Sequence, residues 1–110
     1  MAHSISAEID NDGFLVNLHE WSERVAAELA VGEGITLTED HWTIITATRQ
    51  FYDQFELSPA MRPLIKFIKQ QYPEQAQQIA TSMHLMQLFG GRPAKTIAKI
   101  AGLPKPTNCL

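Results

Sequence analysis

Apolar side chains recur at intervals of three and four positions along most of this chain, which is the spacing that lines one face of a helix. Between these segments stand residues that typically begin or end helices, such as serine, threonine, proline and glycine. The pattern predicts five helices, over residues 18–32, 39–55, 59–72, 74–89 and 93–101. Asn17, Thr38 and Ser58 are the expected N-caps of the first three.

The N-terminal residues follow a different pattern. Asp10-Asn11-Asp12-Gly13 is a turn sequence, and short apolar or alternating segments, 5–9 and 14–16, flank it. These features predict a small β-hairpin before the first helix. The expected fold class is therefore mainly α: a compact helical bundle with a small N-terminal β-hairpin and a flexible C-terminal arm. One helical domain would cover residues 1–102, and the arm would cover residues 103–110.

Two of the expected helices hold residues that interrupt their pattern. In the segment 39–55, a charged side chain, Arg49, falls near the same face as Trp42, Ile45 and Tyr52. Pro63 lacks an amide donor and would crowd the carbonyl of Pro59, so we expect the third helix to kink or restart there.

The segment 74–89 shows a single helical pattern that ends at Gly90 and Gly91. Its expected inward-facing residues are Ala76, Ile79, Ala80, Met83, Leu85, Met86 and Phe89. A soft-metal site made of Cys109, Met83, His84 and Met86 is conceivable for Cu(I). Because both methionines fall at core spacing, however, we expect no metal and no cofactor.

The length and composition fit one soluble, folded domain. The chain has 110 residues, of which 45% are hydrophobic. No apolar run approaches the roughly 20 residues that span a membrane. The first residues, 1–4, lack the charged and apolar regions of a signal peptide. With one cysteine and no export signal, a reducing cytoplasm is the expected location, and no membrane partner is expected.

The net charge of −3 conceals two halves of opposite sign. Residues 1–56 hold eleven acidic side chains against two arginines, a balance of −9. Residues 57–110 hold seven basic side chains against Glu74 alone, a balance of +6. Such asymmetry is typical of an interaction surface, and a solvated helix face is the other interpretation.

Cys109 is the only cysteine and the second-to-last residue. It cannot form a disulfide within its own chain, and the seven residue steps from Gly102 can extend on the order of 20 Å. Pro104 and Pro106 favour an extended, polyproline-like arm. These features predict either a reactive thiol presented to a partner or an idle thiol at a frayed end. Basic side chains near the arm would stabilise the thiolate if the arm folds back towards them; Arg92, Lys95, Lys99 and Lys105 are the candidates.

The C-terminal residues are specific enough to indicate a family. Phe89-Gly90-Gly91-Arg92-Pro93, then Lys95, then Ile100-Ala101-Gly102-Leu103-Pro104-Lys105-Pro106 and the penultimate Cys109 closely resemble the DsrC/TusE family. The resemblance continues upstream through Asp12-Gly13-Phe14-Leu15, Trp21, Leu37-Thr38, Trp42, Arg49-Gln50-Phe51-Tyr52 and Ser58-Pro59. It covers nearly the whole chain, in order.

The resemblance implies a small cytoplasmic sulfur carrier that holds sulfur as a persulfide on Cys109. In the DsrC branch a second cysteine stands eleven residues earlier, where this chain has Ala98. The chain therefore looks like the TusE branch. That branch receives sulfur from a TusBCD-like donor complex and works with an MnmA-like tRNA thiouridylase in 2-thiolation of the wobble uridine. Contact with tRNA would then be weak or indirect.

Arg92, Lys95 and Lys105 are the expected supporting residues, because their positive charge near the arm would steady a thiolate or persulfide anion. For Arg92, capping a helix or pairing with an acid of the N-terminal half is an equal alternative.

Three other functions compete with the sulfur relay. A DsrC-type partner of a sulfite reductase would need a cysteine in place of Ala98. A helix-turn-helix-like nucleic-acid-binding module fits the basic half, but the chain is acidic overall and its aromatic residues are not interleaved with the basic ones. A conventional enzyme would need a catalytic pair, and the four histidines lie on unrelated segments.

Overall fold

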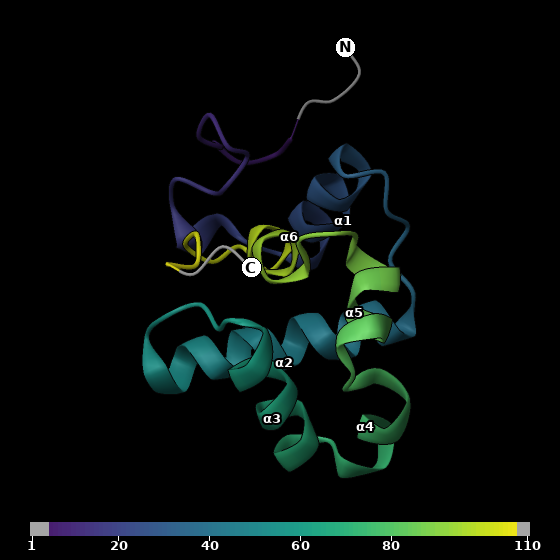
Figure 1. Cartoon of the computed structure of the whole chain (residues 1–110). Coiled ribbons are helices and arrows are strands. Elements are labelled where there is room, and N and C mark those ends of the chain that lie inside the picture. The colour runs from purple at the N-terminus through teal and green to yellow at the C-terminus, as the bar shows by residue number, and fades with distance from the viewer. Residues whose placement is uncertain (1–4, 108–110) are drawn as a thin grey trace.

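The computed structural model describes residues 5–107, and these residues form one 3₁₀ helix and six α-helices. The 3₁₀ helix η1 spans Leu18–Glu20. The α-helices are α1 (Glu23–Gly32), α2 (Glu39–Phe55), α3 (Met61–Gln71), α4 (Pro73–Ile79), α5 (Ser82–Phe89) and α6 (Pro93–Ile100). Figure 1 shows α2 across the middle of the molecule, with α1 and α6 on one side and α3 and α4 on the other. The mainly helical class is confirmed.

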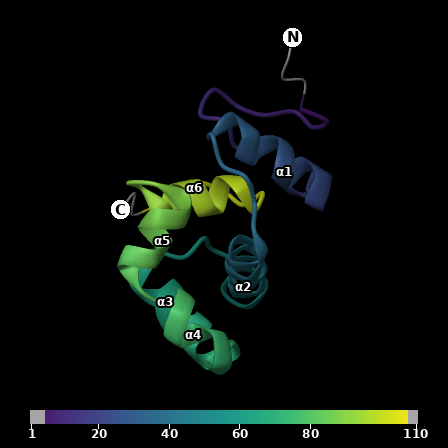
Figure 2. The same ribbon diagram turned by 90° about the vertical axis from the view of Figure 1, so that its right-hand side faces the viewer.

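The core forms where α2 and α6 face the surrounding helices. Helix α6 packs against α1, α2 and α5, and α3 packs against α2 and α4. Figure 2 shows α5 connecting the layer of α3 and α4 to α6. The largest fully buried apolar side chains of the helices come from α2, α3, α4, α5 and α6: Ile44, Ile45, Leu64, Ile68, Ile79, Leu85, Ile97 and Ile100. Their burial holds α6, which leads into the C-terminal segment, at the centre of the fold.

The predicted N-terminal β-hairpin is not confirmed. The chain does reverse at residues 10–13, but residues 5–107 contain only one isolated antiparallel bridge there, between Ile9 and Leu15. The side chain of Asp10 accepts hydrogen bonds from the backbone amides of Asp12 (2.9 Å) and Phe14 (3.0 Å). These bonds tighten the turn locally, and the flanking segments are too short to extend the bridge into paired strands.

The first helix begins later than the sequence predicts. Asn17 does act as a cap, but only for the single turn of η1, where its side chain accepts a hydrogen bond from His19. The chain then becomes extended at Trp21, and Ser22 caps α1 by accepting a hydrogen bond from the amide of Val25 (3.2 Å). Two capping residues therefore stand five positions apart: Asn17 caps η1, and Ser22 caps α1.

The predicted start and end of α2 are confirmed, with Thr38 as the N-cap. The part played by His41 was not predicted: its buried ring reaches back to this cap. The amide of Thr38 donates to Nδ1 (3.0 Å), so the ring proton lies on Nε2 and is donated to the carbonyl of Leu88 (2.9 Å). His41 therefore joins the start of α2 to α5.

The expected kink at Pro63 does not occur, because the helix starts two residues later than predicted. Helix α3 begins at Met61, after Ala60, so Pro63 lies in its first turn. Amide groups in the first turn have no partner within the helix, and a proline there costs no hydrogen bond.

The single helix predicted for residues 74–89 is wrong. The chain breaks at Ala80 and Thr81, and the Thr81 side chain caps α5 by accepting a hydrogen bond from the amide of His84 (3.1 Å). The break rotates α5 relative to α4, so Met83 and Met86 are 70% and 47% exposed rather than inward-facing. Across the described residues, no helix is long and apolar enough to cross a membrane.

Candidate functional site

Cys109, the central candidate of the sequence analysis, lies outside the described residues. The structure follows the chain to Thr107, two residues earlier, so the site is built from its base: the end of α6 and residues 101–107.

The C-terminal end of α6 has a complete glycine cap. The amide of Gly102 donates to the carbonyl of Lys99 (3.1 Å), and the amide of Leu103 donates to that of Ala98 (2.9 Å). This is the pair of hydrogen bonds that defines a Schellman motif, in which the residue after the cap has a positive φ. Gly102 has a φ of +74°, and Leu103, which follows it, is 3% exposed. The chain therefore leaves α6 in one fixed direction.

Gly102 is also required by its contact with Trp21. A Cβ atom at this position would overlap the indole of Trp21, most severely at its Cδ1 atom. The indole is held there because its Nε1–H donates to the carbonyl of Ile100 (2.9 Å). With the indole in this place, the position can hold only a glycine.

Arg49 of α2 completes this base. Its Nη1 donates to the carbonyl of Ala101 (2.6 Å), and its guanidinium carbon lies 3.8 Å from the centre of the Trp21 ring. A cation beside the last carbonyls of a helix is favoured by the helix dipole, and stacking on an indole adds a cation–π contribution. Burial lowers the pKa of Arg49 from its usual range, and the carboxylate of Asp53 partly opposes that shift. We call Trp21, Arg49 and Gly102 the arm anchor.

A hollow of about 320 Å³ opens beside the arm anchor. Its lining residues come from η1, α2 and the start of the arm: Leu18, His19, Arg49, Tyr52, Asp53 and Leu103. Charged and polar groups therefore lie next to the segment that leads to Cys109.

The described part of the arm contacts the helical body at several points. Ser58, in the α2–α3 loop, donates its hydroxyl proton to the carbonyl of Pro104. Lys105 pairs with Asp12 of the N-terminal turn, with 3.2 Å between Nζ and Oδ2. Leu103 and Pro106 are buried. Whether residues 103–110 as a whole move as an arm stays a prediction.

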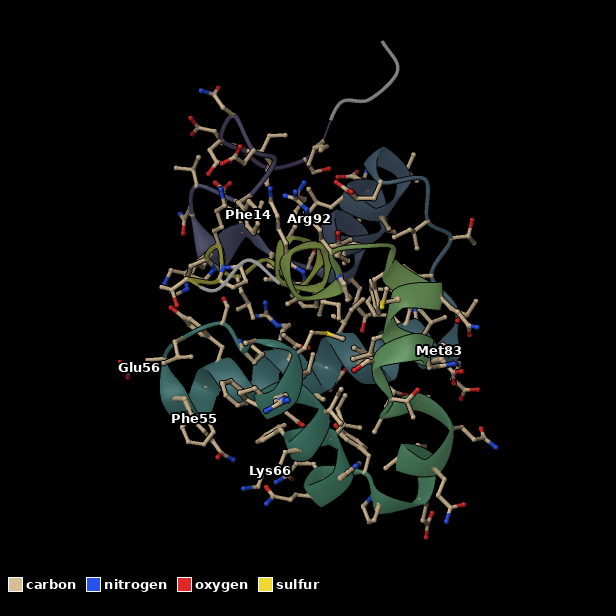
Figure 3. All side chains as sticks on the ribbon, in the orientation of Figure 1. Phe14, Phe55, Glu56, Lys66, Met83 and Arg92 are labelled. Atoms are coloured by element: carbon tan, nitrogen blue, oxygen red, sulfur yellow. The ribbon has the colours of Figure 1, made fainter. Side chains whose placement is uncertain are left out.

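The other two supporting candidates lie at the opposite end of α6. Arg92, labelled in Figure 3, is the exposed N-cap residue. Its side chain makes no cap hydrogen bond. Lys95 is half-buried in the first turn. Nine residue steps of helix separate Arg92 from Ala101, or about 13 Å. Within the described part of the chain, neither residue forms an ion pair. The structure therefore does not bring them to the base of the arm, and their support of a thiolate stays a prediction.

Part of the charge asymmetry is satisfied within the molecule. Lys99 pairs with Glu33 (2.9 Å), as Lys105 does with Asp12, so two cations of the basic half meet acids of the acidic half. Among residues 5–107, no group of three or more histidine, cysteine or acidic side chains is placed to hold a metal ion.

No functional role was predicted for Trp21 or Arg49, although both were noted. Ser58 was predicted to cap the third helix, but Ala60 is the N-cap of α3, and the Ser58 hydroxyl bonds to the carbonyl of Pro104 instead. For Arg49 a signal was present, because a charged residue fell near the apolar face of a predicted helix. Its partners, the carbonyl of Ala101 and the ring of Trp21, are 52 and 28 positions away, and side-chain spacing does not reveal such contacts.

Comparison with known proteins gives consistent results. The family model described as "DsrC like protein" matches residues 2–110. The sulfurtransferase TusE of Sodalis glossinidius is 48% identical over 92% of this chain and 91% of its own. TusE of Yersinia pseudotuberculosis is 47% identical over 94% and 93%.

Solved structures of DsrC proteins share the fold. The solution structure of Allochromatium vinosum DsrC has a TM-score of 0.79 and 37% identity, and covers 93% of this chain and 88% of its own. The oxidized γ-subunit of dissimilatory sulfite reductase (DsrC) from Archaeoglobus fulgidus has a TM-score of 0.75 and 36% identity, with 94% and 92% covered.

Proposed function

Because the chain belongs to the DsrC family, we propose that it is a sulfur-relay sulfurtransferase that carries sulfur as a persulfide on Cys109. The chain is almost half identical, over more than nine-tenths of its length, to proteins named sulfurtransferase TusE. This similarity is the observation that carries the proposed function. The sulfurtransferase role expected from the sequence is confirmed by these relatives. The thiol that performs it is our assignment.

The chemistry needs two exchange steps. The Cys109 thiolate attacks the outer sulfur of a donor persulfide, the donor S–S bond breaks, and the donor thiolate leaves. The acceptor's thiolate then attacks the outer sulfur of the Cys109 persulfide, and Cys109 leaves as the thiolate. No external oxidant or reductant is needed, since each step forms one S–S bond and breaks another.

The lone cysteine suits transfer rather than resolution. With Cys109 as the only thiol in the sequence, its persulfide cannot collapse into an internal disulfide. Ala98, where DsrC-branch proteins place their second cysteine, is fully buried in the core. A two-cysteine reaction with a sulfite reductase is therefore not part of the proposal.

The arm anchor supports this function by fixing where the carrier segment starts. Thr107 is the last described residue, and two residues extend at most about 7 Å. The anchor therefore defines the base from which a partner meets the thiol. Lys105, whose charge stands four residues before Cys109, is the supporting cation we favour over Arg92 and Lys95.

The finer context of the proposal is tRNA modification in the cytoplasm. We infer that a TusBCD-like complex donates the sulfur and that an MnmA-like thiouridylase accepts it for 2-thiolation of the wobble uridine. The TusE name of the relatives supports this context.

Incubation with an isotopically labelled persulfide donor, followed by mass spectrometry, tests the assignment. We expect a gain of one sulfur on the wild-type chain and none on Cys109→Ser, with the matched variant Asn108→Ser loading normally. In cells that contain only Cys109→Ser, wobble 2-thiouridine should be lost. Sulfur loading on Cys109→Ser, or thiolation that persists in those cells, would contradict the role of Cys109.

A further inference from the structure

Helix α3 presents a stripe of unpaired positive charge. Arg62, Lys66 and Lys69 stand four and three positions apart, so they lie along one face of the helix, and all three are exposed. Helix α3 contains no acidic residue, and none of these cations forms an ion pair within the described residues. In this they differ from Lys99 and Lys105, each of which pairs with one acidic side chain of the described chain. We call these three residues the α3 stripe.

An aromatic hollow adjoins the α3 stripe. It has a volume of about 320 Å³ and is lined by Phe51, Phe55, Pro63, Lys66, Phe67 and Gln70. Phe55 is 52% exposed, although its ring contacts Phe51 at a centroid distance of 4.6 Å. Figure 3 shows Phe55 and Lys66 projecting from the same side of the molecule. An exposed aromatic ring thus lies beside a cation on a face that residues 5–107 leave uncovered.

The α3 stripe begins close to the base of the arm. Ser58, which donates to the carbonyl of Pro104, is only three residues before the start of α3. A ligand at the N-terminal end of α3 would therefore lie near the segment that leads to Cys109.

We propose that the α3 stripe and the aromatic hollow bind a single-stranded RNA loop, with phosphates on the cations and a base stacked on Phe55. The inference rests on the proposed function, in which the sulfur is destined for a tRNA uridine. The rise of a helix places the three charges about 6 Å and about 4.5 Å apart along its axis, within reach of successive phosphates. Cations that follow a strand beside an aromatic ring are the usual elements of single-strand binding.

An acidic protein segment is the alternative occupant, and the hollow favours RNA over it. The hollow is open and offers a half-exposed ring, which suits a flat base. Unpaired cations at regular spacing suit a phosphate backbone, whose charges are also regularly spaced.

The test measures binding of a fluorescein-labelled anticodon stem–loop RNA, with unmodified uridine at the wobble position, by anisotropy. The full chain should bind it at about 50 mM salt and weaken steeply by about 200 mM. The variant Arg62→Gln/Lys66→Gln/Lys69→Gln should lower the slope of log K against log salt by about 2, since each lost phosphate contact on a single strand removes about 0.7. Lys66→Gln alone should weaken binding several-fold. Arg24→Gln, which removes an exposed cation from α1, should leave binding unchanged.

Phe55 gives a second, charge-free test. Phe55→Ala should weaken binding about tenfold, whereas Phe55→Tyr, which keeps the ring, should bind like wild type. Thermal unfolding of each variant shows whether it is folded. Because Phe55 is half-exposed, we expect both variants to fold.

The outcomes separate this proposal from the proposed function. Normal sulfur loading on Cys109 together with absent RNA binding, or with RNA binding that the triple variant leaves intact, would overturn the RNA proposal alone. If the triple variant fails to pass sulfur to the acceptor enzyme in the absence of RNA, the surface binds an acidic protein instead. Failure of the wild-type chain to load sulfur would reject the proposed function, whatever the RNA result.

Discussion

The two terminal segments of the described chain are attached to the helical body in different ways. The N-terminal segment is tied to α1 by an exposed polar contact, in which the backbone amide and hydroxyl of Ser6 donate to the carboxylate of Glu28. The C-terminal segment is fixed by the arm anchor, whose hydrogen bonds and ring contact are partly buried. The difference teaches that the segment leading to Cys109 is fixed by partly buried polar contacts, whereas the N-terminal segment relies on exposed polar contacts and on the burial of Phe14 and Leu15.

The largest effect should come from the glycine of the arm anchor. Gly102→Ala forces a side chain into a positive φ and against the indole of Trp21, so it should lower the free energy of unfolding by about 2–4 kcal/mol. Chemical denaturation measures this loss. Gly91→Ala is the matched control, because Gly91 has open space around it and no positive φ, and it should change stability by at most about 0.5 kcal/mol. Equal losses in both variants would show that the anchor is not special.

The second effect should come from Arg49. Arg49→Met removes the hydrogen bond to the carbonyl of Ala101 and the cation over Trp21, and should cost about 1–3 kcal/mol. A double-mutant cycle with Trp21→Phe, which removes the indole N–H, measures how far the two residues act together. We expect a coupling of about 0.5–1 kcal/mol. Strictly additive losses would mean that the two residues hold the arm independently.

Local signals predicted much of this fold, and the arm anchor shows where they stop. Thr38 and Gly102 marked the start of α2 and the end of α6 correctly, because capping depends on a few neighbouring residues. The break at Thr81 was missed because the apolar spacing of 74–89 continues through it. The contact of Arg49 with Ala101 spans 52 positions and depends on how α2 packs against α6, which no local pattern encodes.

The candidate site divides in the same way. Cys109 stood out because a lone cysteine near a chain end is visible in sequence alone. The three supporting cations stood out only by charge, and α6 separates them: Lys105 follows the arm anchor, whereas Arg92 precedes the helix. Arg92, Lys95 and Lys105 are close in sequence, but the length of α6 keeps Arg92 away from Lys105 in space.

Because α6 separates Lys105 from Arg92, the two cations should affect Cys109 differently. Lys105→Gln should slow alkylation of Cys109 by iodoacetamide at neutral pH by about twofold or less, because an exposed cation stabilises a nearby thiolate only modestly. Arg92→Gln removes the same charge at the far end of α6 and should leave the rate unchanged. If Arg92→Gln has the larger effect, the arm must reach back along α6.

The smallest effect concerns the N-terminal contact. The backbone amide of Ser6 is the main cause that lowers the pKa of Glu28, with its hydroxyl and Arg24 adding to it against partial desolvation. Since the pKa is lower in the folded protein, this contact stabilises the fold above the unfolded value of about 4.3, and its contribution is lost as the pH falls through the folded value. Glu28→Gln should therefore slightly flatten the fall in melting temperature between neutral and acidic pH. Because Glu28 lies at the surface, added salt should shrink its effect, while the losses caused by Gly102→Ala should persist.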